Sequence, residues 1–226
     1  MLNKRSLLLL SVLLVSCGTE TSEQTIFLSN NGFTIRCPNA QIGDIGVVDG
    51  VEYEVVDRNL LIHRRNEGKN LSKVCVSLVT DMSFMFYNLN FNQTIGNWDV
   101  SSVQTMEQMF RNIYFNQPIN YWDVSSVTNM NGMFFWSQFN QPIGDWDVSS
   151  VTDMSGMFSG SQFNQPLKNW DVSSVKYMST MFFFSSFDQN ISGWCVSNIT
   201  TEPPDFSRNS PLIEENKPVW GTCPSI

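Results

Sequence analysis

The feature that most constrains this chain is a set of residues that returns every 24 positions between residues 74 and 200. Tryptophan, two methionine positions and two phenylalanine positions all keep this period. The columns are Trp98, Trp122, Trp146, Trp170 and Trp194; Met82, Met106, Met130, Met154 and Met178; Met85, Met109, Met133, Met157 and Met181; Phe86, Phe110, Phe134, Phe158 and Phe182; and Phe91, Phe115, Phe139, Phe163 and Phe187. A fixed period of this length indicates a repeat array. A unit this short buries its apolar face only against its neighbours.

The pattern inside one unit predicts a strand followed by a helix. Apolar and polar residues mix from 143 to 148, which predicts a short strand at 146–148. From 151 to 158 the apolar side chains fall on one helical face, and Ser150 and Thr152 precede it as candidate N-caps. Pro142 keeps the return loop non-helical. We therefore expect an α/β solenoid, a leucine-rich-repeat-like array of 24-residue strand–helix units with disulfide-stapled end caps.

The repeated strings also resemble a known family. "FNQPIGNWDVSSV", "WDVSSVTNMNGMF" and "VSLVTDMSFMF" are similar to repeats of the BspA-like leucine-rich repeat surface proteins of bacteria, a repeat also described as a domain of unknown function in mycoplasma lipoproteins. The resemblance covers residues 74–200. It implies a surface-exposed lipoprotein with a binding or adhesion role, and it supplies no catalytic residues.

The N-terminus predicts export and lipid attachment. Residues 1–16 combine Lys4 and Arg5 with a short apolar run, which is typical of a signal peptide. The string "LVSC" resembles the bacterial lipobox, so cleavage before Cys17 and lipidation of that residue are expected, with residues 17–25 as a lipidated tether. The alternative is an ordinary secretory signal with an incidental cysteine. The expected location is the bacterial cell envelope, lipid-anchored at the outer membrane and surface-exposed.

Four further cysteines suit two disulfides in an exported chain: Cys37, Cys75, Cys195 and Cys223. Cys75 and Cys195 share one column five periods apart. If the units stack as strands, about 24 Å separates them, beyond the reach of a disulfide. Of the two pairings left, Cys37–Cys75 with Cys195–Cys223 is favoured, because the other ties each end to the far end of the array.

These disulfides would attach two end caps to the repeat region, a β-rich cap at 26–73 and an irregular cap at 201–226. Asp49-Gly50 between two β-rich runs predicts a hairpin, and "RNLLIHRRNEG" predicts a short helix that ends near Gly68.

Several classes of function find no support in the sequence. The formal net charge of -8, without a basic stripe, argues against nucleic-acid binding. His63 is the only histidine and lies beside no nucleophile motif, so we expect no enzyme and no cofactor. The aspartate column (Asp99, Asp123, Asp147 and Asp171) could hold calcium, but hydrogen bonds to nearby serines such as Ser149 and Ser150 are the favoured interpretation, and no metal site is predicted. The asparagine column (Asn92, Asn116, Asn140 and Asn164) is expected to satisfy loop backbone groups.

Binding residues are expected where the repeat varies, because the constant positions build the core. The least constant stretch follows each Met-Phe pair. The candidate binding residues are Tyr114, Phe135, Trp136, Tyr177, Phe183 and Phe184, and the alternative is that some of these rings pad the core. A surface binding or adhesion module for a host or matrix protein or glycan is the leading hypothesis, with membrane contact through Cys17. A structural envelope protein without a ligand is the second. Exposure of the aromatic residues in one contiguous patch would favour binding.

Overall fold

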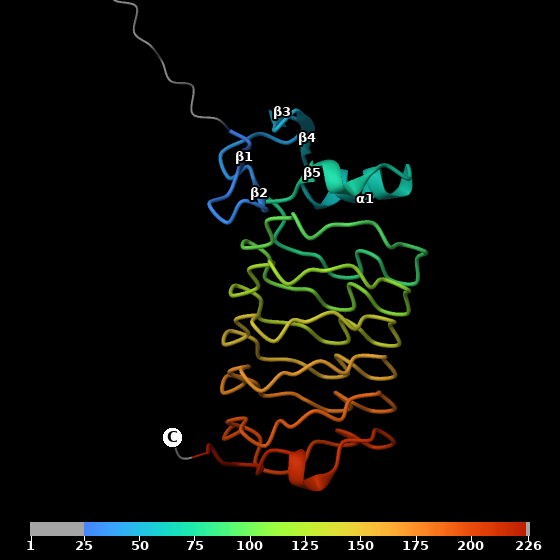
Figure 1. The fold of residues 1–226 in the computed structure, drawn as a ribbon, viewed down its shortest axis with the longest axis vertical. Coiled ribbons are helices and arrows are strands. Elements are labelled where there is room, and N and C mark those ends of the chain that lie inside the picture. The colour runs from blue at the N-terminus through green and yellow to red at the C-terminus, as the bar shows by residue number, and fades with distance from the viewer. Residues whose placement is uncertain (1–24, 225–226) are drawn as a thin grey trace, which may run out of the picture.

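The structure is a computed structural model that describes residues 25–224, and its strands and its α-helix all lie near the N-terminal end (Figure 1). Strands β1 (Phe27–Leu28) and β2 (Ile35–Arg36) form a small antiparallel sheet. A second sheet has the order β3-β4-β5, with β3 (Ile45–Val48) antiparallel to β4 (Val51–Val55) and β4 parallel to β5 (Val74–Cys75). Helix α1 (Arg58–Asn66) and a 3-10 turn, η1 (Leu71–Lys73), connect β4 to β5.

The sequence explains these N-terminal elements, and both predictions made for them are confirmed. Asp49 and Gly50 have φ angles of 49° and 77°, the left-handed pair that a tight two-residue hairpin requires, and they join β3 to β4. Helix α1 begins after Asp57, whose carboxylate accepts a hydrogen bond from the Leu60 amide at 2.8 Å. It ends before Gly68, which has a φ of 70°.

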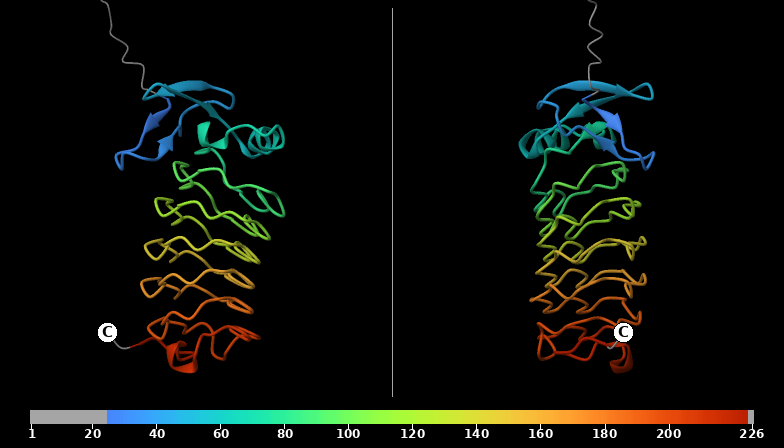
Figure 2. Two further views of the ribbon diagram at one scale, coloured as in Figure 1. Left: turned by 45° about the vertical axis from the view of Figure 1, so that its right-hand side comes forward. Right: turned by 90° about the vertical axis from the view of Figure 1, so that its left-hand side faces the viewer.

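Below this cap, successive 24-residue units stack on one another (Figures 1 and 2). Single parallel bridges 24 residues apart connect Asp81, Thr105, Asn129, Asp153 and Tyr177 in sequence. Alternate amides reach the next unit: those of residues 154, 156, 158 and 160 donate to carbonyls of residues 177, 179, 181 and 183 at 2.7–2.9 Å. The intervening amides of residues 157, 159 and 161 close turns onto carbonyls three residues earlier. The units are therefore chains of turns linked by backbone hydrogen bonds.

The predicted α/β solenoid of strand–helix units is wrong. Across residues 76–213, all of which the structure describes, there is no helix and no strand beyond single bridges; the next element is the 3-10 turn η2 (Glu214–Asn216). The strand predicted at 146–148 and the helix predicted at 151–158 are both absent. Left-handed residues explain the missing helix, because each unit has two of them, four residues apart, and a single one ends a helix. They are Phe84, Gln108, Gly132, Gly156 and Thr180 in one column and Asn88, Asn112, Trp136, Gly160 and Phe184 in the other.

The core predicted from the repeat is confirmed. All the Met, Phe and Trp columns are buried, and they form one continuous cluster through the stack. Rings of neighbouring units lie almost parallel, with centroids 5.6–5.8 Å apart in the Phe86 column and 6.1–6.2 Å apart in the Phe91 column. Each indole of the Trp98 column donates to a backbone carbonyl 27 residues earlier, at 2.9–3.2 Å. Burial therefore depends on the next unit being in register.

The two disulfides are Cys37–Cys75 and Cys195–Cys223, the pairs that the sequence favours. The first joins the loop after β2 to β5 and lies in a separate small core with Ile35 and Val55. The second closes the C-terminal segment onto the last unit, where the Val196 amide also donates to the Thr222 carbonyl. Each disulfide thus ties one end segment to the repeat stack.

Residues 1–24, which include the predicted signal peptide and Cys17, lie outside the described residues. Within the part of the chain that is described, no helix has the length and apolar character needed to cross a membrane.

Candidate binding edge

The stretch after each Met-Phe pair forms one edge of the stack, because its residues repeat in register from unit to unit. The amides of Asn112, Trp136 and Gly160 each donate to the carbonyl 23 residues later, at 2.7 Å, which places these residues one above another. Aromatic and arginine side chains gather at the variable positions of this edge. We define the aromatic edge as Tyr87, Arg111, Tyr114, Phe135, Trp136, Phe183, Phe184 and Arg208.

Arginine guanidinium groups lie on aromatic rings at both ends of the aromatic edge. The Arg111 guanidinium carbon lies 4.3 Å from the ring centroid of Phe135 and 5.7 Å from that of Tyr87, so it is placed between two rings. The Arg208 guanidinium lies 5.0 Å from the Phe183 centroid. Such cation–π contacts hold the guanidinium groups against the rings. The Arg208 guanidinium is also paired with the Asp205 carboxylate, at 3.2 Å.

Trp136 is the most unusual residue of the edge. Its backbone is left-handed, with a φ of 51°, and 56% of the residue is exposed. A bulky residue with this backbone is uncommon and usually marks strain. The indole lies against Gly160 of the next unit: a Cβ atom placed on that glycine would come within 2.6 Å of the indole. Gly160 therefore makes room for the indole ring of Trp136.

A small depression opens between the exposed rings of Tyr114 and Trp136. It has a volume of about 200 Å³, and Asn112, Ile113 and Gln138 complete its lining. Larger depressions lie at the two ends of the molecule, one of about 520 Å³ beside Arg64 and one of about 480 Å³ beside Lys217. In those, the named cations are already paired, Arg64 with Glu54 and Glu67, and Lys217 with Glu202 and Glu214.

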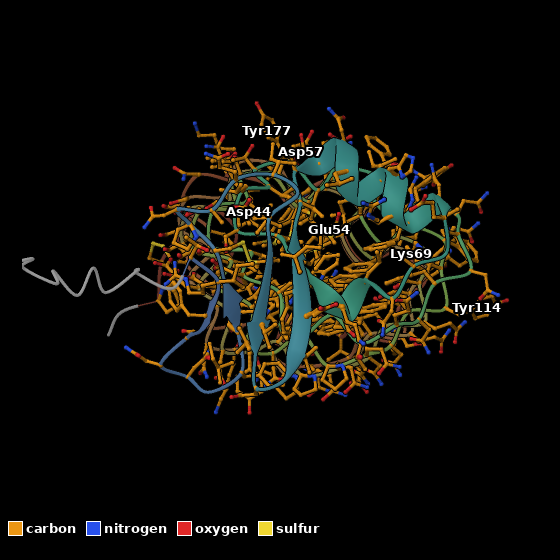
Figure 3. All side chains as sticks on the ribbon, turned by 90° about the horizontal axis from the view of Figure 1, so that it is seen from above. Asp44, Glu54, Asp57, Lys69, Tyr114 and Tyr177 are labelled. Atoms are coloured by element: carbon orange, nitrogen blue, oxygen red, sulfur yellow. A yellow bond between two sulfur atoms is a disulfide. The ribbon has the colours of Figure 1, made fainter. Side chains whose placement is uncertain are left out.

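Five of the six candidate residues lie together on the aromatic edge, and one does not. Tyr114, Trp136 and Phe184 are exposed, while Phe135 and Phe183 are half-buried beneath the arginines, so none of the five pads the core. Tyr177 is exposed but belongs to the bridge column, and Figure 3 shows it and Tyr114 projecting from different sides of the stack. Sequence reasoning missed Tyr87, Arg111 and Arg208. Tyr87 and Arg111 lie in the variable stretches of the repeat, so their positions in the sequence could have identified them as candidates.

The polar columns serve the fold. Asp123 and Asp147 each accept hydrogen bonds from the amide and the hydroxyl of the serine two residues later, and Asp171 accepts from the amide alone. Ser149 bonds Asp147 as expected, but Ser150 does not. In the asparagine column, each side-chain oxygen accepts from the amide 24 residues later, at 2.9–3.1 Å, as predicted. His63 is an exposed residue of α1 beside Glu67.

Asp99 is the buried member of the aspartate column. Burial alone would raise the pKa of its carboxyl. The hydrogen bonds from the hydroxyls of Ser101 and Ser77, both at 2.6 Å, and the nearby Arg36 guanidinium outweigh burial and lower that pKa. Since Arg36 belongs to β2, the ionised Asp99 connects the N-terminal cap to the first units of the stack.

The fold and the edge together define a repeat protein in which short turn-rich units stack in register and present varied side chains along one edge. Residues 58–138 and 115–216 match the family described as "Mycoplasma protein of unknown function, DUF285". These segments cover most of the chain, so the chain belongs to this family. The predicted likeness to the mycoplasma repeat is thereby confirmed. No curated protein and no solved structure matches the chain.

Proposed function

We propose that this protein is a lipid-anchored, BspA-like surface protein of a bacterial envelope that binds an extracellular partner through the aromatic edge. Cys17 would carry the anchor. The repeat stack would hold the edge away from the membrane as a rigid support. The protein acts by binding and catalyses no reaction.

The observation that carries this proposal is the alignment of aromatic and arginine side chains along one edge of the stack. Exposed aromatic side chains and arginines are the residues most often found as anchors in binding interfaces. Here they occupy positions that vary between otherwise near-identical units, and two of them, Trp136 and Phe184, stand on left-handed backbone. A purely structural array gains nothing from large exposed rings at strained positions.

The two disulfides support export. Disulfides persist in oxidising compartments outside the cytoplasm and are rare inside it. The two disulfides lie at the two ends of the described stack.

The location is tested by treating intact cells with trypsin and identifying the released peptides by mass spectrometry. Release of peptides that end at Arg111 and Lys168 is expected. If these peptides are released only after the envelope is broken, the protein is an internal envelope component, which is the structural alternative.

The role of the aromatic edge is tested by adhesion of whole cells to host extracellular matrix. Cells that produce the double variant Tyr114→Ser/Trp136→Gly are expected to adhere as poorly as cells that lack the protein. The matched control is Tyr177→Ser, which removes an equally exposed tyrosine away from the edge. Equal adhesion by both variants would contradict the assignment of the edge.

A further inference from the structure

We infer that the depression between Tyr114 and Trp136 binds one ring of a neutral saccharide. This inference rests on the proposed binding function and narrows it to a ligand class and a subsite. Two successive units build the depression: Asn112, Ile113 and Tyr114 come from one, and Trp136 and Gln138 come from the next.

The walls of the depression are fixed before any ligand arrives. The Asn112 amide donates to the Phe135 carbonyl at 2.7 Å, and the Gln138 amide donates to the Ile113 carbonyl at 3.1 Å. The Asn112 side chain donates to Asn88 Oδ1 at 2.6 Å. The Trp136 ring is held against Gly160. A preformed site avoids most of the entropy cost of ordering side chains on binding.

The polar groups of the depression are available and uncharged. Among the described residues, neither the Tyr114 hydroxyl nor the Gln138 side-chain amide takes part in a hydrogen bond, and Asn112 Oδ1 accepts none. Together these groups offer both hydrogen-bond donors and hydrogen-bond acceptors to a ligand. No lining residue carries a charge at neutral pH. A sugar ring matches this combination, since its C–H face stacks on an aromatic ring while its hydroxyl groups exchange hydrogen bonds with amides.

The size and charge of the depression argue against larger ligands, cationic side chains and anionic sugars. About 200 Å³ is below the usual range of sites for drug-sized ligands, and it suits a single small ring. A lysine or arginine of a partner protein would also stack on Trp136, but the lining holds no carboxylate to pair with it. An anionic sugar would meet no cation inside the depression.

The test is saccharide binding in solution by the full chain purified in mild detergent. The probes are glucose, galactose, mannose, N-acetylglucosamine and N-acetylgalactosamine, with glucuronate as the anionic comparison. Binding is followed by saturation-transfer NMR and by tryptophan emission, which is informative because Trp136 is the most exposed of the seven tryptophans. At least one neutral sugar is expected to bind, and glucuronate more weakly.

Two variants at exposed aromatic residues on left-handed backbone decide the assignment. Trp136→Gly is expected to weaken binding about tenfold or more, the loss of one aromatic anchor. Phe84→Gly also removes an exposed ring from a left-handed backbone, with a φ of 59°, but Phe84 belongs neither to the aromatic edge nor to the lining of the depression, so the affinity of this variant should stay within about twofold of wild type. Because glycine suits both backbones, both variants are expected to fold.

The inference is overturned if no neutral sugar binds, if both variants lose binding, or if neither does. Its failure is distinguishable from failure of the proposed function. Loss of cell adhesion by the edge variant without any saccharide binding would leave the binding function in place and point to a protein partner.

Discussion

At the scale of single residues, Trp136 shows how this repeat is adapted at one position. Its column is left-handed in every unit, and the other members include two asparagines and a glycine, which tolerate that backbone well. Trp136 and Phe184 do not, so the chain accepts strain there in order to expose a ring. Gly160 in the next unit gives the indole a surface to lie on.

Replacement of Trp136 by glycine and by alanine separates this backbone strain from the lost ring. Both variants lose the indole, but only alanine keeps a Cβ on the left-handed backbone. We expect Trp136→Gly to be more stable than Trp136→Ala by about 1 kcal/mol in urea unfolding. At Tyr114, which has no positive φ, the order should reverse. If alanine were the more stable replacement at both positions, Trp136 would be unstrained.

Asp99 gives a prediction about pH. Its pKa is lowered in the folded protein, so its stabilising contribution is complete above its ordinary pKa of 3.8 and is lost as the pH falls through the lower folded value. Asp99→Asn should reduce the free energy of unfolding by about 2 kcal/mol at pH 7, and the difference from wild type should shrink below about pH 4. Urea unfolding between pH 3 and pH 7 measures both. Asp147→Asn, at the exposed equivalent position, should cost less; an equal cost at pH 7 would contradict the role of burial.

At the scale of elements, the sequence predicted what lies inside the stack better than the backbone that carries it. The Met154 and Met157 columns had to be buried whatever the backbone, because a short unit has no other way to cover them. The hairpin at Asp49-Gly50 followed from turn chemistry. The prediction of a helix at 151–158 was wrong because buried side chains three and four residues apart occur in consecutive turns as well as in a helix. Gly132 and Gly156 within the predicted helices were the signal against it.

Only part of the aromatic edge could be predicted from the sequence. Variation between units identified the stretch that contains Trp136, because positions that do not build the core are free to differ. The contact of Arg111 with Phe135 depends on the stacking register, which a single unit does not reveal. Arg208 lies beyond the repeat and reaches the edge only because the last segment continues the stack, with the Phe184 amide donating to its carbonyl.

The two disulfides should differ in their response to reductant. Cys37 and Cys75 are fully buried, whereas Cys223 is exposed and Cys195 is half-buried. Under native conditions, a mild thiol should reduce Cys195–Cys223 first, as measured by alkylation and mass spectrometry. Cys37–Cys75 should react only when the N-terminal cap opens.

Removal of either disulfide should act locally. Their sequence separations of 38 and 28 residues correspond to a loss of about 3–4 kcal/mol each. In the Cys195→Ala/Cys223→Ala variant, hydrogen exchange should accelerate in residues 194–224 and stay unchanged near Met106. Faster exchange throughout the stack would instead show that the end segment controls the stability of the whole array.

At the scale of the whole molecule, stability is a property of contacts between neighbouring units. Each unit contributes its columns to one continuous core and its alternate amides to the next unit. In such an array, stability is approximately a sum of unit terms and nearest-neighbour terms. The repeat length of 24 residues is therefore a strict requirement, while the number of units is not.

Two deletions of different length test this requirement. Removal of residues 125–148 joins Val124 to Ser149, which occupies the position of Ser125 one unit later, so every column continues and Trp170 follows Trp122. The shortened chain should fold and unfold in one cooperative transition, with a lower midpoint and a smaller dependence on urea, because it exposes less surface. Removal of only residues 125–136 joins Val124 to Ser137, puts every later column half a unit out of register and separates the amides from their carbonyl partners. That chain should lose the near-ultraviolet circular dichroism of its stacked tryptophans. Cooperative unfolding of both shortened chains would mean that the units do not depend on register, and the stacking account would fail.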